Sequence, residues 1–146
     1  MNQNIRRTII LDNYEHPFNR SIPSSNDYIK HNSNNVSCID NLDLYIKIKD
    51  NIIEDIQFEG EACVISISST SIMIQNLIGK TIPEALDIIK NYQNMINEEP
   101  YNEEILKDAI VYNDIYKQPS RKKCATLSVN GIEEVLKAYL KNNPEV

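Results

Sequence analysis

The chain has 146 residues, of which 41% are hydrophobic, and this is enough to bury one core, so we expect a single domain over residues 1–146. Its formal net charge of -6 argues against nucleic acid as a partner, because binding to phosphates depends on clustered Lys and Arg side chains. No stretch approaches the roughly 18 apolar residues of a membrane-spanning helix, and residues 1–11 lack the apolar core of a signal peptide. We therefore expect a cytoplasmic protein with no membrane partner.

Three cysteines, Cys38, Cys63 and Cys124, are spread over the sequence. An odd number of cysteines cannot pair completely within one chain, and a reducing compartment disfavours disulfides. The thiols are therefore expected to stay free, to bind a metal or to take part in catalysis.

The N-terminal segment predicts a helix followed by a loop. Ile5, Ile9 and Ile10 have helical spacing, which predicts an amphipathic helix that ends before Pro17 and docks by its Ile face. Residues 16–35 are rich in Asn, Ser and Pro and show no periodicity. We expect a long loop there.

Residues 42–59 predict an antiparallel hairpin with a turn at Asp50-Asn51. Apolar and polar residues alternate in its first half, which is the period of a half-buried strand. The second strand is expected to continue on one face through Ile52, Ile56 and Phe58. Because a hairpin brings its outer ends together, Cys38 just before it and Cys63 just after it are expected to be neighbours.

The middle of the chain predicts two helices. Residues 63–78 combine apolar residues with a face of small Ser and Thr residues, which favours a helix, although the Ile and Ser content also allows a strand. Gly79 ends this segment, and Thr81 and Glu84 have the spacing of a capping box that begins a helix over residues 82–96. The second cysteine is therefore expected at the start of a helix.

The C-terminal part predicts a surface segment and a long final helix. Residues 97–118 are acidic and polar, with a short helical pattern, so we expect an inserted and mostly exposed segment. The final helix is expected to begin near Pro119-Ser120 and to have a break or kink near Asn130-Gly131. Cys124 is expected in its first turn, where the helix dipole and the preceding cations favour a thiolate. The alternative is a small buried hydrophobic residue.

Cys38 and Asp40 are candidates for a metal site. Residues two apart in an extended segment point to the same side. With Cys63 and Cys124 they make four possible ligands, and three thiolates with one carboxylate suit tetrahedral zinc. Arg121, on the same helix face as Cys124, would offset the negative charge of such a site. Each residue alone also has a plain structural interpretation: packing for the cysteines, a turn cap for the aspartate and a solvated face for the cations.

Three blocks of sequence carry a resemblance to a known family. They are Cys38-x-Asp40, residues 58–66 (FEGEACVIS) and residues 121–128 (RKKCATLS). In this order they resemble the SufU branch of the IscU/NifU N-terminal family, and the similarity covers nearly the whole chain. Supporting matches are Tyr14, Pro17, Asn19, Gly79-Lys80-Thr81 and Glu84-Ala85.

The residue before the third cysteine separates the branches of this family. IscU-type scaffolds have a His there, whereas this chain has Lys123, so the resemblance assigns the fourth ligand to Asp40. The chain departs from the family at Val36, Ile39 and Ala62, where Pro, Gly and Gly are usual. The isoleucine is expected to stiffen the loop that carries the first cysteine.

The resemblance implies an α+β fold of the IscU-like (SufE/NifU-like) type, with a small three-stranded antiparallel sheet packed against helices. It implies a zinc-dependent sulfurtransferase that accepts persulfide sulfur from a cysteine desulfurase of the SufS type and passes it to downstream iron-sulfur assembly proteins. Cys38 would accept the sulfur, and Asp40, Cys63 and Cys124 would be the remaining zinc ligands. Arg121 would pair with Asp40 or with the released thiolate.

Two other functions use the same residues. A scaffold would assemble an iron-sulfur cluster on the three cysteines and Asp40, because thiolates bind iron as well as zinc. A zinc-stabilised interaction module would instead hold a closed and inert site. The missing His beside Cys124 favours sulfur transfer.

Overall fold

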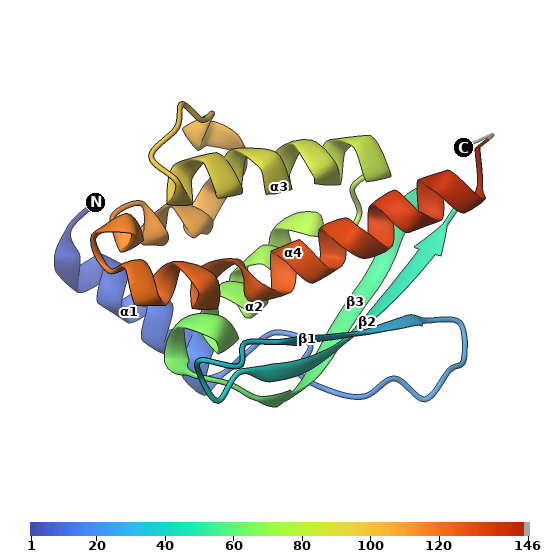
Figure 1. Ribbon diagram of the computed structural model, residues 1–146, viewed down its shortest axis with the longest axis horizontal. Helices are drawn as coiled ribbons and strands as arrows, with labels where there is room; N and C mark the ends of the chain where they lie inside the picture. Colours follow the sequence, from blue (N-terminus) through green and yellow to red (C-terminus); the bar gives the residue numbers. More distant parts are fainter. Residues whose placement is uncertain (145–146) are drawn as a thin grey trace.

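The structure, a computed structural model, describes residues 1–144. Its elements in chain order are α1 (Gln3–Glu15), β1 (Ile29–Asn34), β2 (Asn41–Lys49), β3 (Ile52–Glu61), α2 (Val64–Leu77), α3 (Ile82–Ile96), the 3-10 helices η1 (Glu103–Tyr112) and η2 (Ile115–Lys117), and α4 (Pro119–Asn142). The strands form one antiparallel sheet in the order β1-β2-β3. Helices α2 and α4 lie against one face of this sheet, and α3 lies farther from it (Figure 1). The predicted α+β fold with a three-stranded sheet is confirmed.

The predicted hairpin is confirmed as β2 and β3. Leu42, Leu44 and Ile46 are fully buried. Asp50 and Asn51 at the turn both have positive φ values, 53° and 62°, as tight hairpin turns require.

A bulge decides which residue of β3 enters the core. The register between β2 and β3 shifts near the turn, so Ile53 is buried whereas Ile52 is 39% exposed. The prediction that Ile52 shares the buried face of Ile56 and Phe58 is therefore wrong, because strict alternation does not allow for the extra residue of a bulge.

The prediction of a loop over residues 16–35 is wrong for its last part, which forms β1 and pairs with β2. This strand lacks an apolar alternation because one of its faces is exposed and the other presents His31 and Ser33. Ser33 is buried at the point where Gly131 of α4 approaches the sheet. A small residue is therefore required where the strand pattern would have shown a large apolar one.

Helix α4 continues through Asn130-Gly131, so the predicted break is wrong. The glycine lets the helix lie close to β1, since a side chain there would collide with the sheet. Cys124 lies in the second turn of α4 and not in the first, because the helix begins at Pro119.

The prediction of a mostly exposed segment over residues 97–118 is confirmed for residues 97–104, of which only Tyr101 is partly buried, and it is wrong for residues 105–115, which contribute several side chains to the core. Charged residues occupy the solvent side of η1, which makes the segment polar on average. The two 3-10 helices nevertheless bury Leu106, Ala109, Val111, Tyr112 and Ile115.

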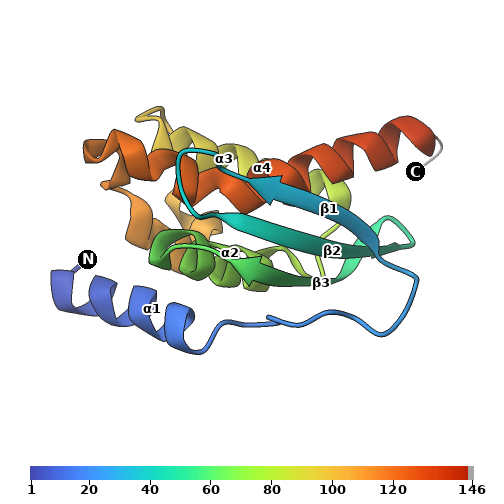
Figure 2. The same cartoon turned by 60° about the horizontal axis from the view of Figure 1, so that its bottom comes forward.

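The remaining predicted helices are confirmed. Figure 2 shows α1 beside α2 at the edge of the molecule. Ile9 and Ile10 pack against the core, whereas Ile5 of the predicted apolar face is 54% exposed. Thr81 and Glu84 form the expected capping box of α3. None of the helices within residues 1–144 is long and apolar enough to cross a membrane.

Candidate metal centre

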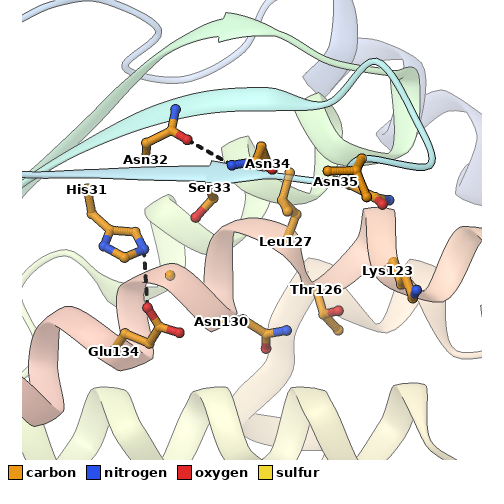
Figure 3. Close-up of a pocket in the computed structure, with 12 residues that line it drawn as sticks. His31, Asn32, Ser33, Asn34, Asn35, Lys123, Thr126, Leu127, Asn130 and Glu134 are labelled. Carbon is orange, nitrogen blue, oxygen red and sulfur yellow. Dashed lines mark hydrogen bonds and ion pairs between the residues drawn. The ribbon is translucent and has the colours of Figure 1, made fainter.

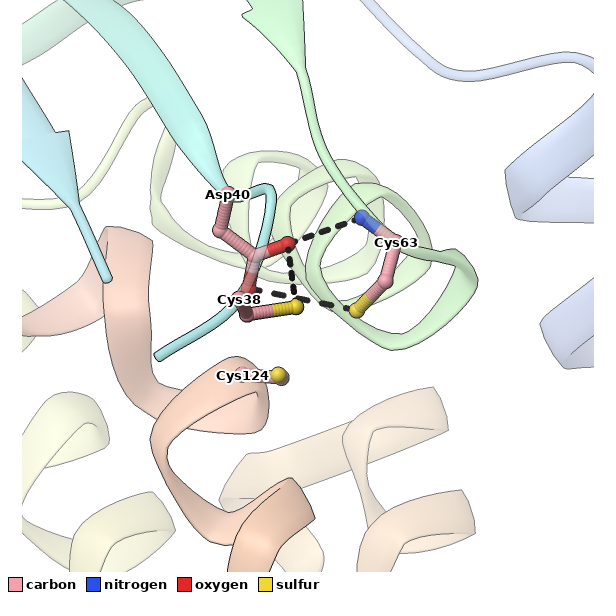
Figure 4. Close-up of side chains that lie close together, drawn as sticks. All are labelled: Cys38, Asp40, Cys63 and Cys124. Carbon is pink, nitrogen blue, oxygen red and sulfur yellow. Dashed lines mark hydrogen bonds between the residues drawn. The ribbon is translucent and has the colours of Figure 1, made fainter. Parts of the chain in front are cut away.

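Four side chains from separate parts of the fold meet at one end of the sheet (Figure 4). Cys38 lies in the loop between β1 and β2, Asp40 directly precedes β2, Cys63 is the N-cap residue of α2, and Cys124 lies in α4. Their ligand atoms, three Sγ atoms and one carboxylate oxygen, all lie within 4.8 Å of one another. We call these four residues the donor cluster. The structure thus brings together all the residues that the sequence suggested as metal ligands.

The hairpin and the start of α2 explain why the donors converge. The two open ends of the β2–β3 hairpin carry Cys38 and Cys63, which are neighbours as expected. Residue Cys63 has extended φ and ψ angles as the N-cap, so its backbone amide points out of the helix toward the carboxylate of Asp40. Helix α4 crosses this end of the molecule and adds Cys124.

Asp40 is tied to the first turn of α2. Its Oδ1 atom accepts a hydrogen bond from the Cys63 backbone amide at 2.8 Å, and its Oδ2 atom accepts one from the Ser66 hydroxyl at 2.5 Å. Burial alone would raise the pKa of Asp40, but the hydrogen bonds from Ser66 and Cys63 outweigh it and hold the pKa below its usual range. The positive end of α2 favours the charged form as well. Asp40 is therefore a carboxylate at neutral pH.

The three thiols are free and differ in accessibility. Cys124 is buried, whereas Cys38 and Cys63 are partly accessible. Burial, together with the nearby Asp40 and Cys63 groups, raises the pKa of the Cys124 thiol. The expectation that the helix dipole and the cations favour a thiolate at Cys124 is therefore wrong for this thiol by itself. A coordinating cation would reverse the preference, because it deprotonates a thiol outright.

The donor set fits a tetrahedral zinc ion. Zinc sites use thiolates at about 2.3 Å and carboxylate oxygens at about 2.0–2.2 Å, so the donors of one site are roughly 3.5 Å apart. The Sγ atoms of Cys38 and Cys63 lie 3.5 and 3.9 Å from the carboxylate oxygens of Asp40. These are contacts of thiol protons, and a cation would take their place when the thiols lose those protons.

Arg121 lies exposed in the first turn of α4, three residues before Cys124. Among the ion pairs of the described residues, none joins Arg121 to Asp40. The carboxylate has Ser66 and the Cys63 amide as partners instead. The other predicted partner of Arg121, a released Cys38 thiolate, stays a prediction.

A polar groove of about 490 Å³ lies between β1 and α4, beside the loop that carries Cys38 (Figure 3). Asn35 and Lys123 line one end of it. His31 and Glu134 face each other at the other end, with 3.4 Å between the Nε2 and Oε2 atoms. The groove is therefore lined by polar side chains of both β1 and α4, and none of the four donor residues lines it.

The sequence patterns do not single out Ser66, which contacts Asp40 across 26 residues of chain. The sequence feature that could have indicated Ser66 is its position three residues after the N-cap cysteine. This places its hydroxyl in the first turn of α2, whose backbone amides face outward. Without the position of Asp40, that hydroxyl is one of several in a serine-rich helix.

Comparison with known proteins places the chain in a family. Residues 5–145 match the NifU-like N terminal domain, and the chain belongs to this family. It is 39% identical over 129 residues to the zinc-dependent sulfurtransferase SufU of Bacillus subtilis, and the match covers 88% of this chain and 86% of that protein. It is 37% identical over 103 residues to the iron-sulfur cluster assembly scaffold protein IscU of Thermotoga maritima, and the match covers 70% of this chain and 72% of that protein.

A solved structure agrees with this assignment. The crystal structure of a proposed iron-sulfur cluster assembly scaffold protein for the SUF system, from Fervidobacterium islandicum AW-1, matches with a TM-score of 0.80 and 33% identity. The match covers 88% of this chain and 93% of that one. The predicted family and fold are therefore confirmed.

Proposed function

We propose that this protein is a zinc-dependent sulfur acceptor that receives persulfide sulfur from a cysteine desulfurase during iron-sulfur cluster assembly. The observation that carries the proposal is the donor cluster, in which one thiol, that of Cys38, lies on an exposed loop. Its neighbours Val36 and Ile39 are 98% and 69% exposed. The similarity to the zinc-dependent sulfurtransferase SufU supports both the metal and the reaction.

The donor cluster would hold the zinc ion through Cys38, Asp40, Cys63 and Cys124. Zinc supplies the positive charge that keeps coordinating thiols deprotonated at neutral pH, and it has no redox activity of its own. Asp40 is fixed to α2, and Cys63 and Cys124 belong to packed helices. Cys38 is therefore the ligand that is free to leave.

Sulfur transfer would be a thiol exchange at Cys38. Its thiolate attacks the outer sulfur of the persulfide on the desulfurase, and a new S–S bond forms at the Cys38 Sγ atom. The S–S bond to the desulfurase cysteine breaks, and that cysteine leaves as a thiolate. The transferred sulfur keeps its proton, so no external oxidant or reductant is required. Arg121 would favour the released Cys38 thiolate through its positive charge.

The partners follow from this chemistry. The donor of sulfur would be a cysteine desulfurase of the SufS type, and downstream iron-sulfur assembly proteins would consume the product. The compartment we propose is the cytoplasm, because its reducing conditions keep acceptor thiols free.

Desulfurase turnover with and without the zinc-loaded protein tests the proposal. We expect strong activation and a single persulfide on Cys38, located by mass spectrometry. Cys38→Ser should accept no sulfur while it keeps the fold, and Val36→Ala is the matched control for a change in the same loop that spares the thiol. Unchanged turnover with no persulfide, or a persulfide retained in Cys38→Ser, would contradict the proposal.

A scaffold function is the second candidate, because the chain is 37% identical to the scaffold protein IscU of Thermotoga maritima and the same donors bind iron. Anaerobic incubation with iron and sulfide separates the two functions. Retention of a cluster by the donor cluster, without activation of the desulfurase, would favour the scaffold. Absence of both persulfide and cluster would favour an inert zinc-stabilised module.

A further inference from the structure

Ser66 of α2 lies at the centre of the contacts that hold the donor cluster. Its side chain is fully buried, with 0% exposed. Its hydroxyl donates to the Asp40 Oδ2 atom at 2.5 Å. The same Oγ atom lies 3.6 Å from the Cys63 Sγ atom and 3.2 Å from the carbonyl oxygen of Cys124. Ser66 therefore contacts three of the four donor residues.

The single hydroxyl proton of Ser66 determines which of these contacts is strongest. The carboxylate of Asp40 is charged and nearer than the Cys124 carbonyl, so it accepts the hydrogen bond from the Ser66 hydroxyl. The Cys63 amide holds the other carboxylate oxygen at 2.8 Å. Asp40 is thus bound at both oxygens to one turn of α2, and it cannot rotate without breaking one of the two bonds.

Cys38 is held in a different way. Its backbone amide donates to the Asn35 carbonyl at 3.0 Å, within its own loop. Its Sγ atom reaches the Asp40 Oδ1 atom at 3.5 Å, and no hydrogen bond of the described residues joins it to Ser66. Three donors are therefore connected through one buried hydroxyl, and the fourth donor is not.

We propose that Ser66 is a positioning residue that keeps Asp40 in the metal site when Cys38 leaves it. The inference rests on the proposed function, in which Cys38 must become free to accept sulfur. A loosely held carboxylate would be the first ligand to dissociate, and Cys38 would then stay bound and protected. By fixing Asp40, Ser66 makes Cys38 the ligand that leaves.

Zinc affinity in a double-mutant cycle tests this role. Ser66→Ala is measured against a competing chelator both in the unaltered chain and in a Cys38→Ala background. In the Cys38→Ala background we expect the Kd for zinc to rise about 10- to 100-fold, the range seen when a ligand loses its orienting partner. In the unaltered chain the rise should be smaller, because Cys38 still holds the ion.

Ser69→Ala is the matched control. Ser69 is also buried in α2, and its hydroxyl donates to the backbone carbonyl of Ser66 at 3.2 Å. Its removal should change the Kd far less than Ser66→Ala does. An effect of Ser66→Ala no larger than that of Ser69→Ala, or an equal effect in both backgrounds, would overturn the proposal.

A second measurement needs no substitution and stays informative even if Ser66→Ala fails to fold. Alkylation of Cys38 with iodoacetamide in the zinc-loaded protein imitates the departure of that ligand. The Cys63 amide, which bonds to Asp40, should stay protected from hydrogen exchange, and loss of this protection would overturn the proposal. Neither test contains a desulfurase. A failure of sulfur transfer with these zinc results intact would therefore reject the proposed function and leave the role of Ser66 standing.

Discussion

Gly131 of α4 lies so close to Ser33 of β1 that a Cβ atom on the glycine would be 2.3 Å from the Ser33 Oγ atom. The same Cβ atom would lie 3.0 Å from side-chain atoms of His31 and Leu44. This contact brings the helix that carries Cys124 against the strand that leads into the loop of Cys38. The close approach of α4 to β1 is therefore made at a glycine outside the donor cluster.

Gly131→Ala tests this close contact. In an exposed helix the change would stabilise by about 1 kcal/mol, because alanine has the higher helix propensity. Here we expect destabilisation of about 1–3 kcal/mol, because the added methyl group overpacks the interface with β1. Urea unfolding of the variant gives the free energy directly. Ser33→Ala in the same chain should restore part of the loss, whereas an unchanged or raised stability of Gly131→Ala would contradict the close packing.

Zinc binding should stabilise the fold through the buried donors. A ligand that binds only the folded state stabilises it by about 4.1 kcal/mol when its free concentration is 1,000 times its Kd. We expect Cys124→Ala to abolish the rise in thermal midpoint that zinc produces, because a buried donor has been removed. Cys38→Ala should keep part of that rise, since the loop donor is the one adapted to leave. Equal zinc-dependent shifts in the two variants would contradict this difference between the donors.

The side chain of Ile39 should restrain the loop that carries Cys38. A β-branched residue has fewer backbone and side-chain conformations than glycine. We therefore expect Ile39→Gly to speed the alkylation of Cys38 in the zinc-loaded protein, measured as the rate of iodoacetamide labelling by mass spectrometry. Val36→Ala serves as the control, because it trims an exposed side chain of the same loop without adding backbone freedom. Identical labelling rates in all three proteins would show that residue 39 does not limit the mobility of the loop.

The capping box of α3 should make stability depend on pH. The backbone amide and hydroxyl of Thr81 hold the pKa of Glu84 below its usual range. A carboxyl group with a lowered folded-state pKa stabilises above its unfolded pKa, and this contribution is lost as the pH falls through the folded value. In the presence of a chelator, the free energy of unfolding should therefore be higher for the unaltered chain than for Glu84→Gln at about pH 6, and the two should converge by about pH 3. A difference that persists unchanged at the lower pH would mean that the charge of Glu84 does not contribute.

Local patterns in the sequence were sufficient for much of the fold. The helical spacing of α1, the capping box of α3 and the alternation in β2 each involve residues a few positions apart, and all three elements are present in the structure. Strand β1 was not predicted, because its inward-facing residues are His31 and Ser33 and not large apolar residues. Large side chains do not fit there, because Gly131 of α4 lies close to the strand. The burial of part of residues 97–118 was not predicted, because exposed charged residues dominate the composition of this segment.

The sequence by itself determined the family, the hairpin and the four candidate metal ligands, because their types and their order along the chain carry that information. Only the tertiary structure decided how the donors are held. It placed Asp40 on the first turn of α2 through Ser66, buried Cys124 in the second turn of α4, and left Cys38 on an accessible loop. These properties arise from contacts between residues far apart in the chain, and periodicity and spacing do not report such contacts.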